Sequence, residues 1–422
     1  MSAQVSGKVY PDANRLGHLP KNNPQVPESI GIGIDLAADL RGHFEGKKIT
    51  RLQSGNAIHR WIAAIRRLVF ADETSTIVGS TIAMPATPES LPFDQRACFV
   101  AGQAKSGTTL LVALLDNHPE LLVLPEETAY FPTVLTKYAP RGRRAQFDYL
   151  TKQSLSNVLF GGPCKWGKRS YSGFPRQKFL DTFERAAFDP ANAEEDLLVL
   201  MVKAYAETLQ RPRNTIRRWV EKTPANRNHI SAILARFPRA KILVTMRDPR
   251  AILAAQIALE KTRKTGRFST YYVIAHWRVA ARLAKRVRDG DIPGLVVPYE
   301  QLVFEPTSTM EKVCGYLEIT FDPQTVLTPT KVGRFWSGNS AARIDFSQIS
   351  AEPATRWQRE LSDDEIGWVE WHCRDLMPAF GYEPRLNRPR ELRYFIRPIR
   401  GERPREYLKS RLYSFRDDWI RG

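Results

Sequence analysis

The sequence predicts an α/β fold in which a doubly wound parallel sheet is flanked by helices. From residue 97 onward, short apolar runs alternate with stretches of helical periodicity, which is typical of a parallel sheet covered by helices. One apolar run, residues 97–101, leads through a turn with two glycines into a predicted helix. This strand, turn and helix are the second observation, because phosphate-binding α/β proteins use the same arrangement. Residues 93–384 are therefore expected to form the main domain.

The main domain divides into expected strands and helices in chain order. The apolar runs predict strands at residues 97–101, 121–124, 219–221, 241–246 and 295–298. Stretches with a period near 3.6 predict helices at residues 108–117, 194–210, 229–237, 249–260, 271–288, 307–317 and 363–380. The sequence shows no internal repeat.

Two segments flank this domain. Residues 1–92 are rich in turn formers and are expected to be an N-terminal extension that is partly helical or poorly ordered. Within it, residues 58–69 have an apolar stripe opposite three arginines. This helix is expected to pack on the main domain or a partner subunit, with a membrane surface as the alternative.

Residues 385–422 form a basic C-terminal tail with twelve Lys or Arg against five Asp or Glu, interleaved with aromatic residues. Such a mixture can bind single-stranded nucleic acid. An RNA-binding motif is missing, however. We therefore expect the tail to pack over the domain or to meet an anionic acceptor, with no nucleic-acid partner.

Charge and cysteine content narrow the class of protein. The net charge of +18 and the pI near 9.8 predict a surface that attracts anions. The four cysteines form no C-x-x-C pair, which argues against zinc and a disulfide framework and favours a reducing compartment. The sequence shows neither a signal-peptide layout nor an apolar run of the ~20 residues that span a bilayer. We expect a soluble, cytoplasmic protein whose membrane contact is at most peripheral; the sequence gives no oligomeric state.

The stretch AGQAKSGTTL, residues 101–110, nearly matches a phosphate-binding loop. Gly102 and Gly107 keep the spacing of a Walker A loop, but Lys105 lies between them and Thr108 stands where the lysine belongs. A strand, a glycine-containing turn and a helix N-terminus gather backbone N–H groups into an anion site. The predicted sheet is therefore P-loop-like. The residues expected to bind the anion are Lys105, Ser106, Gly107, Thr108 and Thr109.

The order of residues in this loop favours one kind of transferred group. A P-loop kinase needs the lysine after the glycine and an acidic partner for magnesium. Here the strand at 241–246 leads instead to Arg247 before Asp248. A donor whose transferable group hangs on a single phosphate needs less positive charge and no metal. Sulfuryl transfer has this chemistry.

At this point the sequence resembles the sulfotransferase family, whose donor is 3'-phosphoadenosine 5'-phosphosulfate. Four segments match in order over about residues 97–383. They are AKSGTTLLVALLDNHPEL, which resembles the 5'-phosphosulfate loop; KILVTMRDPRAILAA, which resembles the 3'-phosphate segment; VEKTPANRNHI with VVPYEQLVFEP; and WSGNSAARI with TRWQRELSDDEI and FGYEP. The resemblance implies a metal-free enzyme that moves a sulfuryl group to an acceptor hydroxyl by in-line displacement.

The 3'-phosphate segment departs from the family pattern. The family usually has a serine eight residues after its first arginine, and this position is Ala255. Arg247 is expected to pair with the 3'-phosphate by charge, and Gln256 to supply the missing hydrogen bond.

The resemblance also suggests catalytic roles. Lys105 is expected to contact the leaving oxygen. Glu127, in PEETAYF, is the preferred base because it matches a family E-E-T pattern, and His118 is the second candidate. Lys222, in EKTP, is expected to contact the sulfuryl group or the acceptor. The alternatives are a salt bridge with Glu221 and a helix N-terminal contact before Pro224.

The acceptor is less defined. A saccharide hydroxyl is favoured, followed by peptide tyrosine and small phenols or lipids, with an acceptor pocket built from residues 130–195 and 261–275. Two alternatives stay open from the residues alone: a P-loop kinase-type phosphoryl transferase, and a non-catalytic protein that binds polyanions through its basic ends.

Overall fold

The computed structural model describes residues 90–162, 171, 173–262, 270–336, 338, 348–386 and 408. Every described residue belongs to one compact unit of the chain, within Ala83–Gly422. The predicted N-terminal extension up to residue 89, with its amphipathic helix at 58–69, lies outside the described residues. So does the basic tail beyond residue 386, apart from residue 408.

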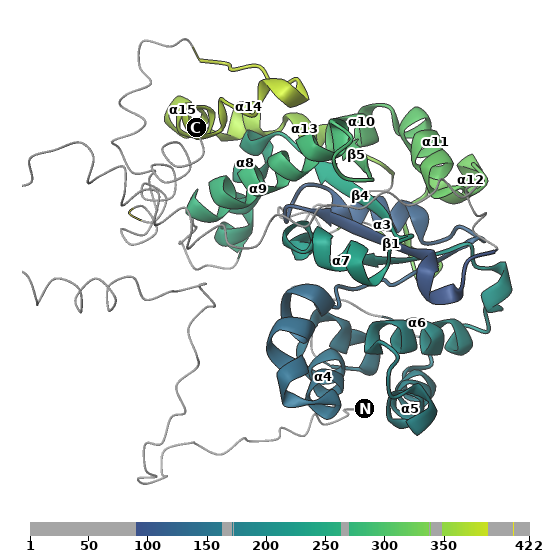
Figure 1. The fold of residues 1–422 in the computed structure, drawn as a ribbon. Helices are drawn as coiled ribbons and strands as arrows, with labels where there is room; N and C mark the ends of the chain where they lie inside the picture. The colour runs from purple at the N-terminus through teal and green to yellow at the C-terminus, as the bar shows by residue number, and fades with distance from the viewer. Residues whose placement is uncertain are drawn as a thin grey trace, which may run out of the picture. The chain divides into compact units, whose positions relative to one another are not determined.

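A single parallel sheet forms the centre of the domain (Figure 1). Its strands are β1 (Ala97–Gly102), β2 (Leu121–Val123), β3 (Arg218–Lys222), β4 (Lys241–Met246) and β5 (Leu295–Pro298). Their order is β2-β3-β1-β4-β5, and each neighbouring pair is parallel. The chain therefore places strands on both sides of β1, reaching the edge strand β2 before it returns to β3, which confirms the P-loop-like doubly wound fold. In such sheets ligands bind at the carboxyl ends of the strands where the winding direction changes, here between β1 and β4.

Helices and short 3₁₀ or π-helical segments, labelled η, connect the strands. In the first half they are η2 (Phe93–Arg96), α3 (Thr108–Leu115), η3 (Tyr130–Tyr138), η4 (Ala139–Arg141), α4 (Arg143–Asp148), η5 (Tyr149–Gln153), η6 (Leu155–Phe160), α5 (Arg176–Phe188), η7 (Pro190–Asn192), α6 (Leu197–Thr208) and η8 (Arg213–Thr215). The second half contains η9 (Pro224–Asn228), α7 (Ile230–Arg236), α8 (Pro249–Thr262), α9 (Thr270–Arg288), α10 (Tyr299–Phe304), α11 (Pro306–Leu317), α12 (Pro323–Val326), α13 (Glu352–Thr355), α14 (Trp357–Glu360), α15 (Asp363–Cys373) and η10 (Pro378–Phe380).

All five predicted strands are confirmed, and each of the seven predicted helices overlaps a helix of the structure. The last one is shorter than predicted, because α15 ends at Cys373 and the chain turns before η10. The sequence did not predict α4, α5, α10 or the short helices α12, α13 and α14. It also did not predict a small antiparallel hairpin of β6 (Thr330–Lys331) and β7 (Arg334–Phe335). Among the described helices, none combines the length and apolar content that crossing a bilayer requires.

The two faces of the sheet bury separate apolar clusters. Alternate strand residues such as Cys98, Val100 and Val220 pack with α3, α11 and α12. The residues between them, such as Phe99 and Trp219, pack with α6, α7, α8 and α9 on the other face. This alternation follows from the two-residue period of a strand. The sheet is therefore the middle layer of three, which places its carboxyl edge between two sets of helices.

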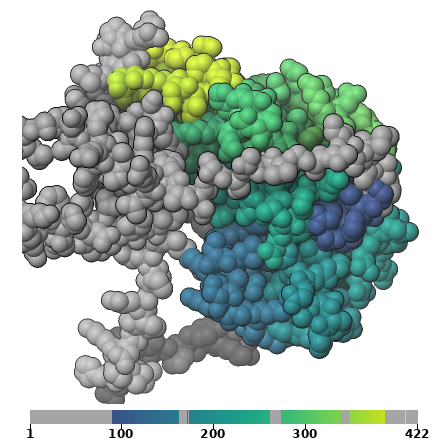
Figure 2. Space-filling view, viewed as in Figure 1, coloured from purple at the N-terminus to yellow at the C-terminus, as the bar shows by residue number. Residues whose placement is uncertain are grey.

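The C-terminal part of the described chain closes over α8. Arg250, near the start of α8, forms ion pairs with Asp248 and with Glu370 of α15. Its guanidinium also lies 4.1 Å from the ring centroid of Trp357. In the space-filling view the yellow residues around α15 lie against green residues (Figure 2). These contacts fix the segment that follows β4, which carries Arg247.

Candidate active site

The loop between β1 and α3 depends on two glycines. Gly102 ends β1 at a φ of 152°, and a Cβ there would lie 2.3 Å from Oγ1 of Thr245 on β4. Gly107 precedes α3 with a φ of 94°, and its Cβ would lie 2.4 Å from Cδ2 of Tyr299. Both positions exclude a side chain, so the loop follows a close path over the ends of β1 and β4.

The hydroxyl of Ser106 stabilises this path. It donates to the carbonyl oxygen of Gln103 at 2.7 Å and shares a hydrogen bond of 2.6 Å with Oγ1 of Thr245. Because Ser106 is buried, its side chain holds the loop in shape. Lys105 has a φ of 77°, a left-handed conformation that costs a non-glycine residue about 1–3 kcal/mol and persists where its surroundings impose it.

The first turn of α3 offers the groups that bind an anion. Thr108 and Thr109 open the helix after Gly107, and among the described residues no side chain caps it. The first N–H groups of a helix have no partner within the helix and carry its positive dipole end. A phosphate or sulfate group fits such a site, and Lys105 and Thr109 belong to the same segment.

Arg247 follows β4 and reaches back to this loop. Its Nη1 donates to the carbonyl oxygen of Lys105 at 2.8 Å, and its Nη2 donates to the carbonyl oxygen of Pro353. Its guanidinium lies 4.2 Å from the ring centroid of Tyr299. Within the described residues, its buried Nε has no hydrogen-bond partner. A buried cation thus lies beside the loop, and its positive charge favours an anion there.

Gln256 stands differently from Arg247. Its Nε2 donates to Oε1 of Glu260, one turn further along α8, at 3.3 Å. Ala255 is buried, and its methyl group cannot supply the hydrogen bond of the family's serine. The structure therefore brings Arg247 to the loop, while the amide of Gln256 is engaged within its own helix.

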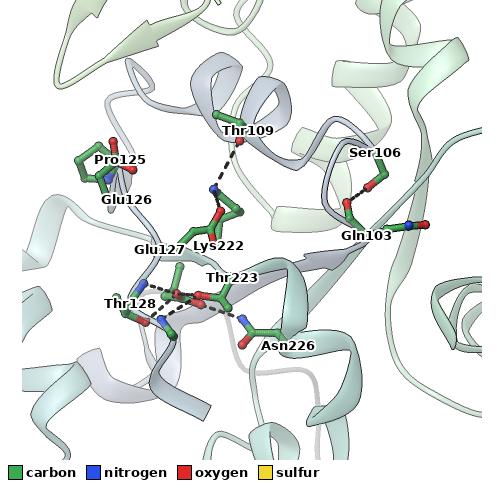
Figure 3. Close-up of polar contacts among 12 residues, drawn as sticks. Gln103, Ser106, Thr109, Pro125, Glu126, Glu127, Thr128, Lys222, Thr223 and Asn226 are labelled. Carbon is green, nitrogen blue, oxygen red and sulfur yellow. Dashed lines mark hydrogen bonds and ion pairs between the residues drawn. The ribbon is translucent and has the colours of Figure 1, made fainter. Parts of the chain in front are cut away.

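Lys222 connects the loop to the acidic segment that follows β2. Its Nζ donates to Oε1 of Glu127 at 2.7 Å and to Oγ1 of Thr109 at 3.4 Å. Figure 3 shows the lysine between these two side chains. Lys222 is buried, whereas the Glu127 side chain is 32% exposed. The buried ammonium thus lies between the anion site and a carboxylate that solvent reaches.

Glu221 has other partners, so the predicted alternative of a Lys222–Glu221 salt bridge is wrong. Its Oε1 accepts hydrogen bonds from Oγ1 of Thr128 and of Thr223, both at 2.7 Å, and its Oε2 accepts one from Nδ2 of Asn226 at 2.8 Å. Burial raises the pKa of Glu221, and these hydrogen bonds oppose the rise. Adjacent residues of β3 face opposite sides of the sheet, which separates Glu221 from Lys222.

The neighbouring acid, Glu126, is enclosed. Its side chain is fully buried and accepts hydrogen bonds from Tyr171 and from Nζ of Lys331, the latter at 3.3 Å. Of the two adjacent glutamates, Glu127 is therefore the one whose carboxylate an acceptor can approach.

His118 does not lie at this site. It precedes the amino end of β2, whereas Glu127 follows the carboxyl end. Its Nδ1 accepts from the backbone N–H of Glu120 at 3.1 Å, and its Nε2 lies 2.7 Å from the carbonyl oxygen of Thr320. Because both ring nitrogens bond the backbone, the histidine fixes the turn before β2. The structure thus argues against the second candidate base.

Three residues that shape the loop are not predicted from the sequence. Tyr299 packs against Gly107, Thr245 holds Ser106, and Arg227 donates from Nη1 to the carbonyl oxygen of Gly102 at 3.0 Å. A signal existed for Tyr299, because it opens the Y-E-x-L segment that resembles the family, yet the motif alone gave it no role. Thr245 lies in an apolar strand and carries no such signal.

Comparisons with known proteins agree with this geometry. Residues 98–323 match the model of a family described as the sulfotransferase family. Protein-tyrosine sulfotransferase A of Caenorhabditis elegans is 22% identical over 327 residues, which cover 71% of this chain and 74% of the relative. Carbohydrate sulfotransferase 2 of Mus musculus is 27% identical over 99 residues, which cover 24% of this chain and 18% of the relative.

Among solved structures, the sulfotransferase domain from the Synechococcus PCC 7002 olefin synthase is 20% identical. It covers 68% of this chain and 95% of its own, with a TM-score of 0.42. The family match includes the anion-binding loop, Glu127, Lys222 and Arg247, and it extends over more than half of the 422 residues. The chain therefore belongs to the sulfotransferase family.

Proposed function

We propose that this sulfotransferase moves a sulfuryl group from 3'-phosphoadenosine 5'-phosphosulfate to the phenolic hydroxyl of a tyrosine in a peptide. One observation carries the proposal: the buried Lys222 ammonium contacts both Glu127 and Thr109, and so connects a candidate base to the anion-binding helix end. The choice of acceptor rests on the relatives. The tyrosine sulfotransferase matches along most of both chains, whereas the carbohydrate sulfotransferase matches a quarter of this one. Tyrosine therefore replaces the saccharide that the sequence favoured.

The donor site fits a ligand with two anionic ends. The 5'-phosphosulfate would lie at the start of α3, held by the N–H groups and hydroxyls of Thr108 and Thr109 and by the Lys105 ammonium. The 3'-phosphate would lie by Arg247, whose Nε has a donor to give. Ser106 and Gly107 would act by shaping the loop.

In the proposed reaction the acceptor oxygen forms a bond to sulfur while the bond from sulfur to the 5'-phosphate oxygen breaks. The donor supplies the sulfuryl group and leaves as adenosine 3',5'-bisphosphate. Glu127 takes the hydroxyl proton, which general-base catalysis requires at hydrogen-bond range. Lys105 neutralises the charge that grows on the leaving oxygen, and Lys222 faces the same region from β3.

Ligand binding separates this proposal from a kinase. Ligands that bind the folded state raise the melting temperature by mass action. Adenosine 3',5'-bisphosphate should raise it clearly, and ATP with magnesium should not. A shift with ATP alone would contradict the donor assignment. A protein that merely binds polyanions would keep its binding when Lys105 is replaced by Met.

Activity tests the acceptor. Donor labelled with radioactive sulfur should transfer label to peptides that contain one tyrosine and not to the same peptides with phenylalanine. Label that appears on a sulfate-free glycan instead would move the proposal to a saccharide. Glu127→Gln should lower kcat by about 100- to 10,000-fold with an unchanged bisphosphate shift, whereas Glu184→Gln, an exposed carboxylate, should keep wild-type kcat.

A further inference from the structure

We propose that Glu221 is a positioning residue for the transfer reaction, and that it acts through Thr128 to hold Glu127 in place beside Lys222. The inference rests on the proposed role of Glu127 as the base. Glu221 itself is 1% exposed, so it acts on substrates through other residues.

Glu221 is a buried carboxylate whose two oxygens are both hydrogen-bonded. Its carboxylate accepts four hydrogen bonds, two from the N–H and hydroxyl of Thr128 and one each from Thr223 and Asn226. Burying a carboxylate costs free energy unless such partners surround it. An apolar residue at the end of β3 would avoid that cost. The presence of a carboxylate there therefore indicates a role beyond packing.

Two adjacent pairs of side chains join β3 to the segment after β2. Lys222 binds Glu127, and the preceding Glu221 binds the following Thr128. The first pair holds the candidate base by its side chain. The second pair holds the next residue by both backbone and side chain, which fixes the direction in which the chain presents Glu127.

The backbone just beyond this pair is strained. Ala129 has a φ of 52°, a left-handed conformation that needs support from its surroundings. The support comes from the same cluster, because the N–H of Ala129 donates to Oγ1 of Thr223 at 3.1 Å and that of Tyr130 donates to Oγ1 of Thr128 at 3.2 Å. If Glu221 no longer held Thr128, the turn could relax and carry Glu127 away from Lys222.

Removing the Thr128 hydroxyl tests this link without changing the volume of the side chain. Thr128→Val should lower kcat by about 10- to 100-fold, the effect of a small displacement of a catalytic group. The KM for the donor and for the tyrosine peptide should stay unchanged, as should the melting-temperature shift with adenosine 3',5'-bisphosphate. Thr128→Ser should restore kcat. Thr136→Val, which removes an exposed hydroxyl in η3, is the matched control and should keep wild-type kcat.

Substitutions of Glu221 itself separate hydrogen bonding from charge. Glu221→Gln can keep the bonds to one oxygen, and its amide can donate to Asn226, whose buried Oδ1 has no partner among the described residues. This variant should therefore keep most of kcat. Glu221→Ala should lose as much kcat as Thr128→Val. If Glu221→Ala fails to fold, the kcat of Thr128→Val still tests whether the contact between Glu221 and Thr128 positions Glu127.

A double variant shows whether the effect passes through Glu127. In a Glu127→Gln background, Thr128→Val should lower the residual kcat no further, because residues that act through one group are not additive. Wild-type kcat in Thr128→Val, a raised KM in place of a lowered kcat, or an additive loss in the double variant would each overturn the inference. Full activity in Glu127→Gln would instead overturn the proposed base, whatever Thr128→Val does.

Discussion

The guanidinium of Arg247 lies 4.2 Å from the ring centroid of Tyr299, and the same ring lies against Gly107, where a Cβ would come 2.4 Å from Cδ2. A single aromatic side chain from the start of α10 therefore contacts both the cation after β4 and the glycine that precedes α3. Nη1 of Arg247 also donates to the carbonyl oxygen of Lys105. The proposed 3'-phosphate site at Arg247 and the proposed 5'-phosphosulfate loop are therefore in direct contact.

A methyl group at Gly107 should disturb this arrangement. Gly107→Ala places a Cβ 2.4 Å from Cδ2 of Tyr299 at a φ of 94°, so the ring or the loop must move. We expect a loss of about 1–3 kcal/mol in the free energy of unfolding and no melting-temperature shift with adenosine 3',5'-bisphosphate. Urea unfolding and thermal scans measure both. Gly315→Ala, in an open position on α11, is the control and should bind the bisphosphate normally.

The ring of Tyr299, more than its hydroxyl, should matter for donor binding. Tyr299→Phe keeps the stacking on Arg247 and should bind adenosine 3',5'-bisphosphate like the wild type. Tyr299→Ala removes a cation–π contact of about 0.5–2 kcal/mol and should weaken binding by about 2- to 30-fold. Calorimetric titration checks the difference. Equal affinity of the two variants would show that the stacking does not position Arg247.

Lys222 should affect the chemical step far more than folding. Lys222→Met keeps the length of the side chain and removes the ammonium between Glu127 and Thr109. Loss of one preorganised donor commonly costs about 100- to 1,000-fold in kcat, and we expect a decrease of this size in the tyrosine-peptide assay. Lys152→Met, which removes an exposed ammonium paired with Asp148, should leave kcat unchanged. A raised KM for the peptide with normal kcat would assign Lys222 to acceptor binding instead.

His276 should make the fold sensitive to acid. Burial, together with the nearby charge of Arg227, lowers the pKa of His276 from 6.5 to about 3. The unfolded chain therefore binds a proton at this residue between pH 6.5 and 3 that the folded chain does not bind, so stability falls as the pH decreases through this window. His276→Gln removes the titrating group and should flatten the dependence of the free energy of unfolding on pH in this window. Urea unfolding at several pH values measures it, and parallel curves for the two proteins would refute the assignment.

His118 should matter for stability alone. Its ring bonds the backbone at Glu120 and Thr320, so His118→Phe removes two partly buried hydrogen bonds and should cost about 1–3 kcal/mol of the free energy of unfolding. Activity per folded molecule should stay at the wild-type level. A loss of kcat in fully folded His118→Phe would return this histidine to the list of candidate bases.

The strands were predictable because their sequences are unambiguous. Strands buried on both faces of a parallel sheet are rich in apolar residues, as are the runs at 97–102 and 241–246, in which Lys241 and Thr245 are the polar exceptions. Helix α5 was missed because its apolar positions, such as Phe179 and Phe183, lie in a stretch that reads as variable loops between 130 and 195. The hairpin of β6 and β7 has strands of two residues, too short for any periodicity.

For the site, motif spacing located the loop and the charged residues but not their partners. The pairing of Lys222 with Glu127 instead of Glu221 depends on which face of β3 each residue occupies, and this follows from the sheet order. Likewise, EKTP gave no sign that its glutamate is buried among four donors. Gln256 was chosen by its position in the sequence, and its bond to Glu260 depends on the geometry of α8.

The place of β3 in the sheet has a consequence for how this enzyme can vary. Strand β3 lies between β2 and β1. Its last two residues, Glu221 and Lys222, face opposite sides of the sheet because adjacent residues of a strand alternate between its two faces. A substitution at either residue removes one of the two contacts that hold Glu127, whereas a one-residue insertion or deletion in β3 would exchange the ammonium and the carboxylate. Length changes are therefore far more damaging in these five residues than in the loops on either side, and a library built on this fold should keep the β3 reading frame fixed.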